Sequence, residues 1–333
     1  MKNFLDLQEQ RRKDIFGQTG TLAGLPVSAI EKDWWVTLVL KAIFSLPFSR
    51  HIVFKGGTSL SKGWNLIERF SEDIDLAIDR SFLGFAGDLS KTQVRKLRKE
   101  SCKFVRNDFL KILDDTLLKM GITGYKLIAP EVKESDTDPF VLEFPYRSVT
   151  EKSPYLQPRV LIEIGARSLM EPCGDRPVQS MVGQYFKGQD FADPPVMIPV
   201  VLPKRTFLEK AFLLHEEFQK PGEKMRVERM SRHMYDLERL MDTEHGRDAL
   251  KDSELYQAII KHREQYHTVR GIDYSHHSHG KIDFIPPDNI KRDWEKDYKI
   301  MQESMIYGVS MNFNKLIDRL KELRKRFRRT KLE

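Results

Sequence analysis

Two aspartates, Asp73 and Asp75, lie two residues apart in a short apolar run. Successive side chains of a strand point to opposite faces, so both carboxylates are expected on one face and Ile74 and Leu76 on the other. Like charges held together repel each other unless a cation or proton neutralises them, and carboxylate oxygens favour magnesium or manganese. The spacing therefore predicts a divalent-metal site.

A glycine pair precedes these acids. Residues 52–54 form an apolar run typical of a strand, which stops at Gly56 and Gly57, and residues 58–70 are predicted to form a helix. Glycine lets the backbone approach a ligand closely, and a helix start can present amides to phosphate. Strand, glycine turn, helix and strand together predict metal-dependent phosphoryl transfer. Each motif alone is also compatible with a tight turn or a solvated strand end.

A third acid, Glu163, lies in the segment RVLIEIGA at 159–166. The neighbouring residues Val160, Ile162 and Ile164 share one strand face, which leaves Glu163 on the other. A third carboxylate on a neighbouring strand would complete a clamp for two cations. The alternative is an acid on the solvent side of a strand.

These segments resemble the signature of nucleotidyltransferases with the DNA polymerase β-like fold. EKDWWVTLVL at 31–40, FKGGTSLSK at 54–62 and RFSEDIDL at 69–76 resemble the AbiEii/AbiGii toxin family, which includes the MenT toxins. That family belongs to bacterial toxin–antitoxin and phage-defence systems. The resemblance implies an α+β nucleotidyltransferase fold with a mixed sheet, an N-terminal helix covering one face, and a helical C-terminal domain.

The resemblance also implies an NTP substrate with Mg²⁺ or Mn²⁺ as cofactor. Asp73, Asp75 and Glu163 would be catalytic and bind the metal. The expected nucleotide-binding residues are Gly56, Gly57, Thr58, Ser59, Lys62, Arg69 and Ser71.

Two further residues come from the helical second half. Lys210 lies on the apolar stripe of helix 206–219, where a lysine either extends to solvent or meets an anion. It partly matches the family's K-x-x-A motif, and we assign it to the triphosphate as a catalytic and nucleotide-binding residue. The segment 229–241 resembles the motif R-x-x-[RK]-D-x-Y-D-L, with His233 at a position where many relatives have aspartate. We assign its Asp236 to the catalytic residues, where it would pair with Lys210 or line the site; the alternative is an ordinary surface or capping acid.

Prolines recur between residues 171 and 203, which indicates a connector with short extended pieces. We therefore predict a catalytic domain at 1–200 and a helical domain at 201–333. With 333 residues and 40% hydrophobic content, the chain can build one large core or two domains. No apolar run is long enough to span a membrane and no secretory segment is visible, so a cytoplasmic protein is expected.

The net charge of +7 equals the excess of basic residues between 315 and 331. We predict that this tail contacts the RNA backbone, although amphipathic packing also explains its pattern. A second basic helix, predicted at 91–119, is interpreted as a solvated face. The residues of the tail predicted to bind RNA are Arg324, Lys325, Arg326, Arg328 and Arg329.

The resemblance to MenT toxins implies transfer of NMP to the 3′ end of tRNA, which would block aminoacylation. A protein or small-molecule hydroxyl is an alternative acceptor, and a catalytically silent RNA-binding or partner-binding protein is a further alternative. A cognate antitoxin, the base of the NTP and the oligomeric state stay open. His276, His277 and His279 lack the spacing of a structural metal site, and we predict no metal there.

Overall fold

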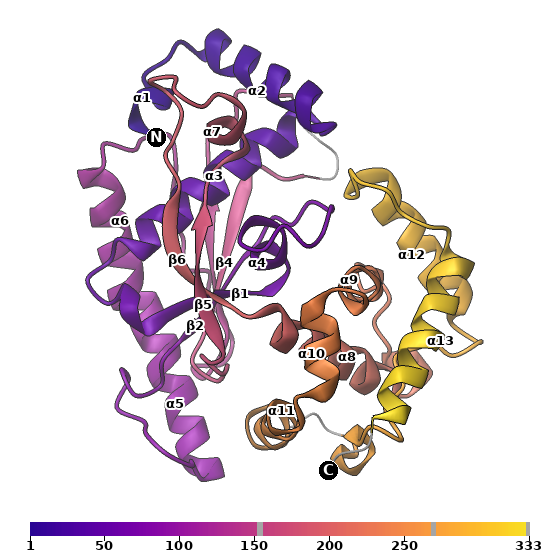
Figure 1. Cartoon of the computed structure of the whole chain (residues 1–333). Helices are drawn as coiled ribbons and strands as arrows, with labels where there is room; N and C mark the ends of the chain where they lie inside the picture. The colour runs from indigo at the N-terminus through magenta and orange to yellow at the C-terminus, as the bar shows by residue number, and fades with distance from the viewer. Residues whose placement is uncertain (152–155, 268–270, 331–333) are drawn as a thin grey trace. The chain divides into compact units, whose positions relative to one another are not determined.

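The computed structural model describes residues 1–151, 156–267 and 271–330. Across these residues, none of the helices combines the length and the apolar content that crossing a membrane requires. The chain forms two compact units (Figure 1). Unit 1 contains Met1–Trp64 and Phe70–Val201, and unit 2 contains Asn65–Arg69 and Leu202–Glu333.

Unit 1 is built on a six-stranded sheet with the order β3-β4-β2-β1-β6-β5. The neighbours β2 and β4 are parallel, as are β1 and β6, whereas β1–β2, β3–β4 and β5–β6 are antiparallel. The sheet is therefore mixed, as the family resemblance implied. The strands are β1 (Ile52–Lys55), β2 (Ile74–Ile78), β3 (Phe140–Pro145), β4 (Arg159–Gly165), β5 (Cys173–Val178) and β6 (Val196–Val201).

One long apolar helix, α3 (Val27–Phe44), crosses a face of this sheet (Figure 1). Its residues are buried around most of its circumference, including Trp34 and Trp35, which confirms the expected N-terminal helix cover. The other helices of unit 1 are α1 (Lys2–Leu5), α2 (Glu9–Ala23), α4 (Gly56–Lys62), α5 (Lys91–Phe104), α6 (Leu110–Lys119) and α7 (Met181–Tyr185). The single helix predicted at 91–119 is interrupted by a π-helical turn at Val105–Phe109.

The helix predicted for residues 58–70 is much shorter than expected. α4 ends at Lys62, and Asn65 has a left-handed backbone with a φ of 52°, which an α-helix cannot contain. The five residues Asn65–Arg69 then pack in unit 2 before the chain returns to unit 1 at Phe70. The sequence had assigned these residues to the first domain.

The proline-containing connector is also more ordered than predicted. It contains β5, α7 and β6, and the two strands extend the sheet from β1 outward. Pro177 lies in β5, which is an edge strand. An edge strand tolerates a residue without an N–H group, so the prolines concealed a strand instead of excluding it.

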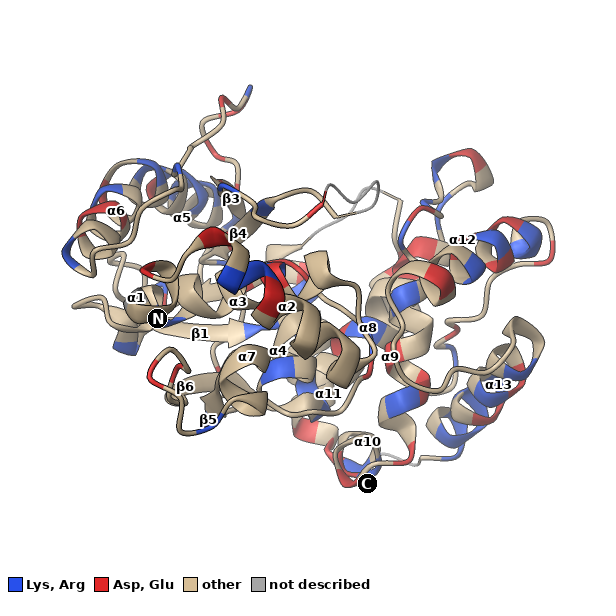
Figure 2. Ribbon diagram, turned by 90° about the horizontal axis from the view of Figure 1, so that it is seen from above, with Lys and Arg blue, Asp and Glu red and all other residues tan. Residues whose placement is uncertain are grey.

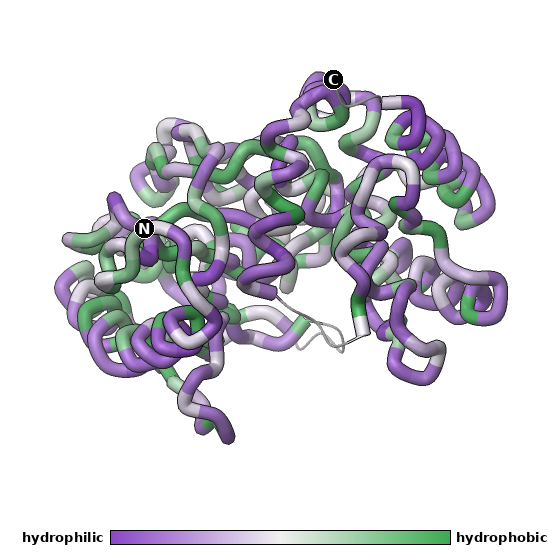
Figure 3. Tube along the Cα trace, turned by 90° about the horizontal axis from the view of Figure 1, so that it is seen from below, coloured by the Kyte–Doolittle hydropathy of each residue, from purple (hydrophilic) through white to green (hydrophobic). Residues whose placement is uncertain are grey.

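Unit 2 is helical. Its helices carry hydrophobic and hydrophilic residues on different sides (Figure 3), as expected for helices that share a core. They are α8 (Pro203–Phe218), α9 (Ser231–Met241), α10 (Glu244–Lys251), α11 (Ser253–Tyr266), α12 (Lys291–Ser304) and α13 (Phe313–Arg329).

Candidate active site

Asp75 and Glu163 occupy paired positions on neighbouring parallel strands. Paired residues of adjacent strands are about 4.8 Å apart, so the two carboxylates start from neighbouring points of one sheet face. Asp73 precedes β2 by one residue, and it is partly exposed like Asp75, whereas Ile74 between them is buried. The predicted alternation and the position of Glu163 beside the aspartates are thus confirmed. Their role in catalysis stays a prediction.

The acids influence one another electrostatically. Burial raises the pKa of Glu163, and the negative charges of Asp75 and Asp73 raise it further, while Lys55 opposes the change. Lys55 on β1 lies opposite Asp75 on β2 in the register of the two antiparallel strands. A carboxylate in such a place is stabilised by a proton or a cation.

Three carboxylates are a donor set that suits magnesium or manganese. In the described parts of the chain, no three or more His, Cys, Asp or Glu side chains are grouped so as to hold a metal ion as they stand. Binding would therefore require Asp73, Asp75 and Glu163 to turn toward a common point. The register of β2 and β4 places Asp75 and Glu163 at neighbouring backbone positions.

Gly56 is the residue that brings the glycine turn against the acids. Its φ is +79°, a conformation that L side chains rarely adopt, and a Cβ atom built on it would lie 1.9 Å from Oδ2 of Asp75. Both the backbone angle and the space therefore require glycine. Gly57 follows it in the first turn of α4. The sequence predicted close approach of a ligand, and the structure places the Asp75 carboxylate there.

Hydroxyl groups fix α4 to the segment that carries the aspartates. Thr58 donates to the carbonyl oxygen of Asp73 at 2.5 Å, and its hydroxyl is also hydrogen-bonded to that of Ser71 at 2.9 Å. Ser59 donates to the carbonyl oxygen of Gly56. Thr58 and Ser59 are fully buried. These hydroxyls are engaged within the protein, so their predicted contact with a nucleotide would depend on backbone amides.

A row of buried charges on α3, which was not among the predicted site residues, supports the same region. Lys32 forms a buried ion pair with Glu72, the residue before Asp73. Asp33 pairs with Lys62, a predicted nucleotide-binding residue at the end of α4. Consecutive charges inside an otherwise apolar helix were the signal that could have identified these supports, because buried charges require partners.

Glu31, the first charge of this row, binds a different segment. Its carboxylate accepts hydrogen bonds from the hydroxyls of Ser148 and Thr150 and from the backbone N–H of Val149. α3 is thereby joined to the residues that follow β3 as well as to those that flank the aspartates.

The structure brings Arg69, Lys210 and Asp236 together inside unit 2. The Arg69 guanidinium holds both oxygens of Asp236 at 2.7 Å, and Nζ of Lys210 lies 2.7 Å from Oδ2. Of the alternatives left open for Asp236, pairing with Lys210 is therefore present. The three residues are buried, so the predicted contacts of Arg69 and Lys210 with a nucleotide stay untested expectations.

The protonation of this cluster follows from its charges. Burial alone would raise the pKa of Asp236, but the attraction of Arg69 and Lys210 outweighs burial and lowers the pKa below its ordinary value. Burial, followed by the charge of Lys210, lowers the pKa of His233 well below its ordinary value. Its Nδ1 lies 3.3 Å from Nζ of Lys210.

The basic residues predicted to bind RNA lie on α13, where acidic residues accompany them (Figure 2). The arginines at 324, 326 and 328 pair with Asp283 or Asp242, which come from outside the helix. Within the described chain, Lys325 and Arg329 have no carboxylate within ion-pairing distance. Much of the formal charge of α13 is therefore compensated.

The three histidines of the loop at 276–279 do not converge. His277 is buried and pairs with Glu216 at 3.0 Å, His279 stacks on Tyr256, and His276 lies near Asp273. Each therefore has a separate packing environment.

A protein-family model described as "Nucleotidyl transferase AbiEii toxin, Type IV TA system" matches residues 38–324. Among solved structures, the chain is similar to MenT4, a nucleotidyltransferase toxin from Mycobacterium tuberculosis H37Rv. The two share 17% identity, with a TM-score of 0.52, over 96% of this chain and 90% of that one. A search of curated proteins gave no match. The family match confirms the resemblance noted in the sequence, and the structural similarity confirms the expected α+β fold.

Proposed function

Because this chain belongs to the AbiEii family of nucleotidyltransferase toxins of type IV toxin–antitoxin systems, we propose that it transfers NMP from an NTP to RNA in a metal-dependent reaction. We propose the 3′ end of tRNA as the acceptor. Nucleotide added there would block aminoacylation and so stop translation. The toxin would act in the cytoplasm, where tRNA and NTP are available, and would serve in phage defence.

The observation that carries the proposal is the paired register of Asp75 and Glu163 beside Gly56. A fold gains no stability from placing two acids side by side at a glycine turn. Such an arrangement is explained by a bound cation, and clustered titratable groups of this kind mark functional sites.

Asp73, Asp75 and Glu163 would hold Mg²⁺, or Mn²⁺ in its place. The bound cation would neutralise phosphate charge and orient the NTP for in-line attack on its α-phosphate. The protein's own residues then have distinct tasks. Thr58 and Ser71 keep α4 fixed to the Asp73 backbone, and Lys32 holds Glu72 beside it. The acids are thereby presented on an anchored strand.

Membership in a type IV toxin–antitoxin family implies a cognate antitoxin.

The proposal is tested by incubating the purified protein with total tRNA, Mg²⁺ and each α-labelled NTP in turn, and by separating labelled RNA from labelled protein on a denaturing gel. Asp75→Asn removes the charge at the paired position while keeping the side-chain shape. Asp115→Asn, on the exposed surface of α6, is the matched control. A parallel sample uses tRNA whose 3′ ribose has been oxidised with periodate.

We expect label on RNA with the wild type and Asp115→Asn, and none with Asp75→Asn or with oxidised tRNA. Label that persists on oxidised tRNA would contradict the 3′ end as the acceptor. Label on protein would reject RNA as the acceptor and favour a protein hydroxyl. If none of the NTPs labels RNA or protein, RNA is likewise rejected, and a small-molecule hydroxyl or a catalytically silent binding role is favoured.

A further inference from the structure

Helix α5 of unit 1 presents a strongly basic exposed surface. A capping box formed by Ser90 and Gln93 begins the helix, and Val94, Leu97 and Cys102 face the core at helical spacing. The basic residues lie on the other side of the helix, where most of them are exposed. Figure 2 shows them as blue bands along α5. They are Lys91, Arg95, Lys96, Arg98, Lys99 and Lys103.

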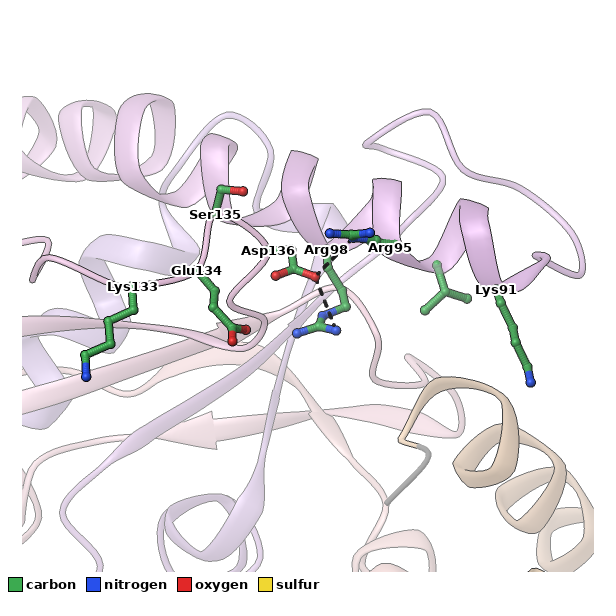
Figure 4. A pocket seen from close by; sticks show the side chains of 8 residues that line it. Lys91, Arg95, Arg98, Lys133, Glu134, Ser135 and Asp136 are labelled. Carbon is green, nitrogen blue, oxygen red and sulfur yellow. Dashed lines mark ion pairs between the residues drawn. The ribbon is translucent and has the colours of Figure 1, made fainter. Parts of the chain in front are cut away.

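An open pocket of about 540 Å³ lies between this helix and the loop that precedes β3 (Figure 4). Four of its eight lining residues are cationic: Lys91, Arg95, Arg98 and Lys133. Asp136 is shared by two of them, at 3.4 Å from Arg98 and 4.0 Å from Arg95. Glu134 and Asp136 are the two acids of the lining, so the four cations leave the pocket with an excess of two positive charges.

The charges of α5 are more available than those of α13. Among the residues that the structure describes, Lys91, Lys96, Lys99 and Lys103 have no carboxylate within 4.0 Å, and all are exposed. The side chain of Arg95 is 73% exposed. On α13, by contrast, most arginines are paired, several with acids from other segments. The helix with the smaller formal charge therefore offers more uncompensated charge.

The basic surface is anchored to the strand that carries Glu163. Asp138, at the end of the pocket loop, accepts hydrogen bonds from the hydroxyl of Ser101 on α5 at 2.7 Å and from the backbone N–H of Ala166 at 3.0 Å. Ala166 follows Glu163 by three residues, which is roughly 10 Å of extended chain. A long substrate bound along α5 would thus lie within reach of the acids of the same unit.

We propose that α5 and the pocket loop at 133–136 bind the phosphate backbone of the RNA acceptor, an inference that rests on the proposed function. Lys91, Arg95 and Lys99 follow one another at intervals of four residues, about 6 Å along the helix axis, and so form a row of positive charge that a chain of phosphates can follow. The exposed face of α5 lacks the aromatic and aliphatic anchors of a protein interface, and it lacks the apolar residues that insert into a membrane. The contacts would be independent of base sequence.

The test measures binding of a fluorescein-labelled tRNA transcript in the absence of NTP, from 50 to 200 mM salt. One variant of the full chain combines Lys91→Gln, Arg95→Gln and Lys99→Gln. The control combines Lys315→Gln, Lys325→Gln and Arg329→Gln, which removes the same charge from exposed positions of α13. Thermal melting establishes that both variants fold.

Each lost phosphate contact lowers the magnitude of the slope of log K against log salt concentration by roughly 0.7–0.9. We expect the α5 variant to lose about two units of slope and roughly 10- to 100-fold in affinity at 0.1 M salt, with little change in the α13 variant. Equal losses in both variants would show a general charge effect and overturn the assignment, as would wild-type binding by the α5 variant. Absence of tRNA binding by the wild type would also overturn it. Because no NTP is present, failure of nucleotidyl transfer alone would contradict the proposed function and leave this surface supported.

Discussion

Replacing Gly56 by alanine tests whether the glycine turn sets the position of the Asp75 carboxylate. The new Cβ atom would lie 1.9 Å from Oδ2 of Asp75, and ordinary van der Waals contact begins at 3.4 Å. The carboxylate must therefore retreat by about 1.5 Å or the turn must open. Misplacing a reacting group by about 1 Å can cost roughly 100-fold in rate. We expect Gly56→Ala to lose at least about 100-fold in nucleotidyl transfer.

The substitution also strains the backbone, and a second glycine separates the two effects. Gly84 has a φ of +85°, close to that of Gly56, but a Cβ built on it meets nothing within 4 Å. Left-handed backbone costs an alanine about 1–2 kcal/mol, which corresponds to roughly 2–8 °C of melting temperature in a domain of this size. Gly84→Ala should show this loss of stability and keep its activity.

The assay compares single-turnover incorporation of α-labelled nucleotide by the two variants, after melting curves have defined a temperature at which both are folded. We expect Gly56→Ala to be much slower than Gly84→Ala at equal fractions of folded protein. Activities within about fivefold of each other would refute it, because the Asp75 contact would then have no consequence beyond backbone strain.

Three further predictions concern buried charges. Lys32→Met leaves Glu72 in the interior without its ion-pair partner, so we expect the free energy of unfolding, measured in urea, to fall by about 3–5 kcal/mol. A decrease below about 1 kcal/mol would contradict the buried pair. Asp236→Ala leaves two buried cations without a counter-ion and should cost a similar amount, whereas unchanged stability would mean that the cluster is hydrated. Glu216 is held by Arg263 and His277, which overcome the effect of burial and lower its pKa to about 2. Its carboxylate therefore stabilises the fold above pH 4.5, and this contribution disappears as the pH falls toward 2. Glu216→Gln should cost about 3 kcal/mol at pH 7 and progressively less below pH 4.5, and a difference independent of pH would be inconsistent with the ion pair.

The strand faces of Asp73, Asp75 and Glu163 could be predicted because they depend on local sequence alone. A strand has a period of two, so the positions of Asp73, Asp75 and Glu163 decided which face each would occupy before any packing was known. The glycine pair marked the end of a strand for a similar reason. The family resemblance then placed Glu163 beside the aspartates, which a pattern within one segment cannot do.

The packing of residues Asn65–Arg69 within unit 2 could not be predicted from the sequence. The pattern from Thr58 to Phe70 is compatible with a helix, and only the left-handed backbone at Asn65 ends that possibility. Arg69 is held there by Asp236, which lies 167 positions later in the chain. An ion pair between residues so far apart in the chain cannot be detected from local periodicity. Arginine and aspartate, each considered alone, are residue types that usually lie on the surface.

The charged residues of this chain show which sequence features distinguish a buried charged side chain from an exposed one that can bind a partner. Lys32 and Lys210 interrupt apolar helical stripes, and both have buried carboxylate partners. The basic residues of α5 instead alternate with its apolar stripe, and most of them remain exposed. α13 has the same amphipathic pattern, yet most of its arginines are compensated, because Asp242 and Asp283 from other segments pair with them. Position within the helical period therefore predicts burial, whereas compensation at the surface depends on tertiary neighbours. A count of charged residues along α13 consequently overstates the attraction that RNA would experience.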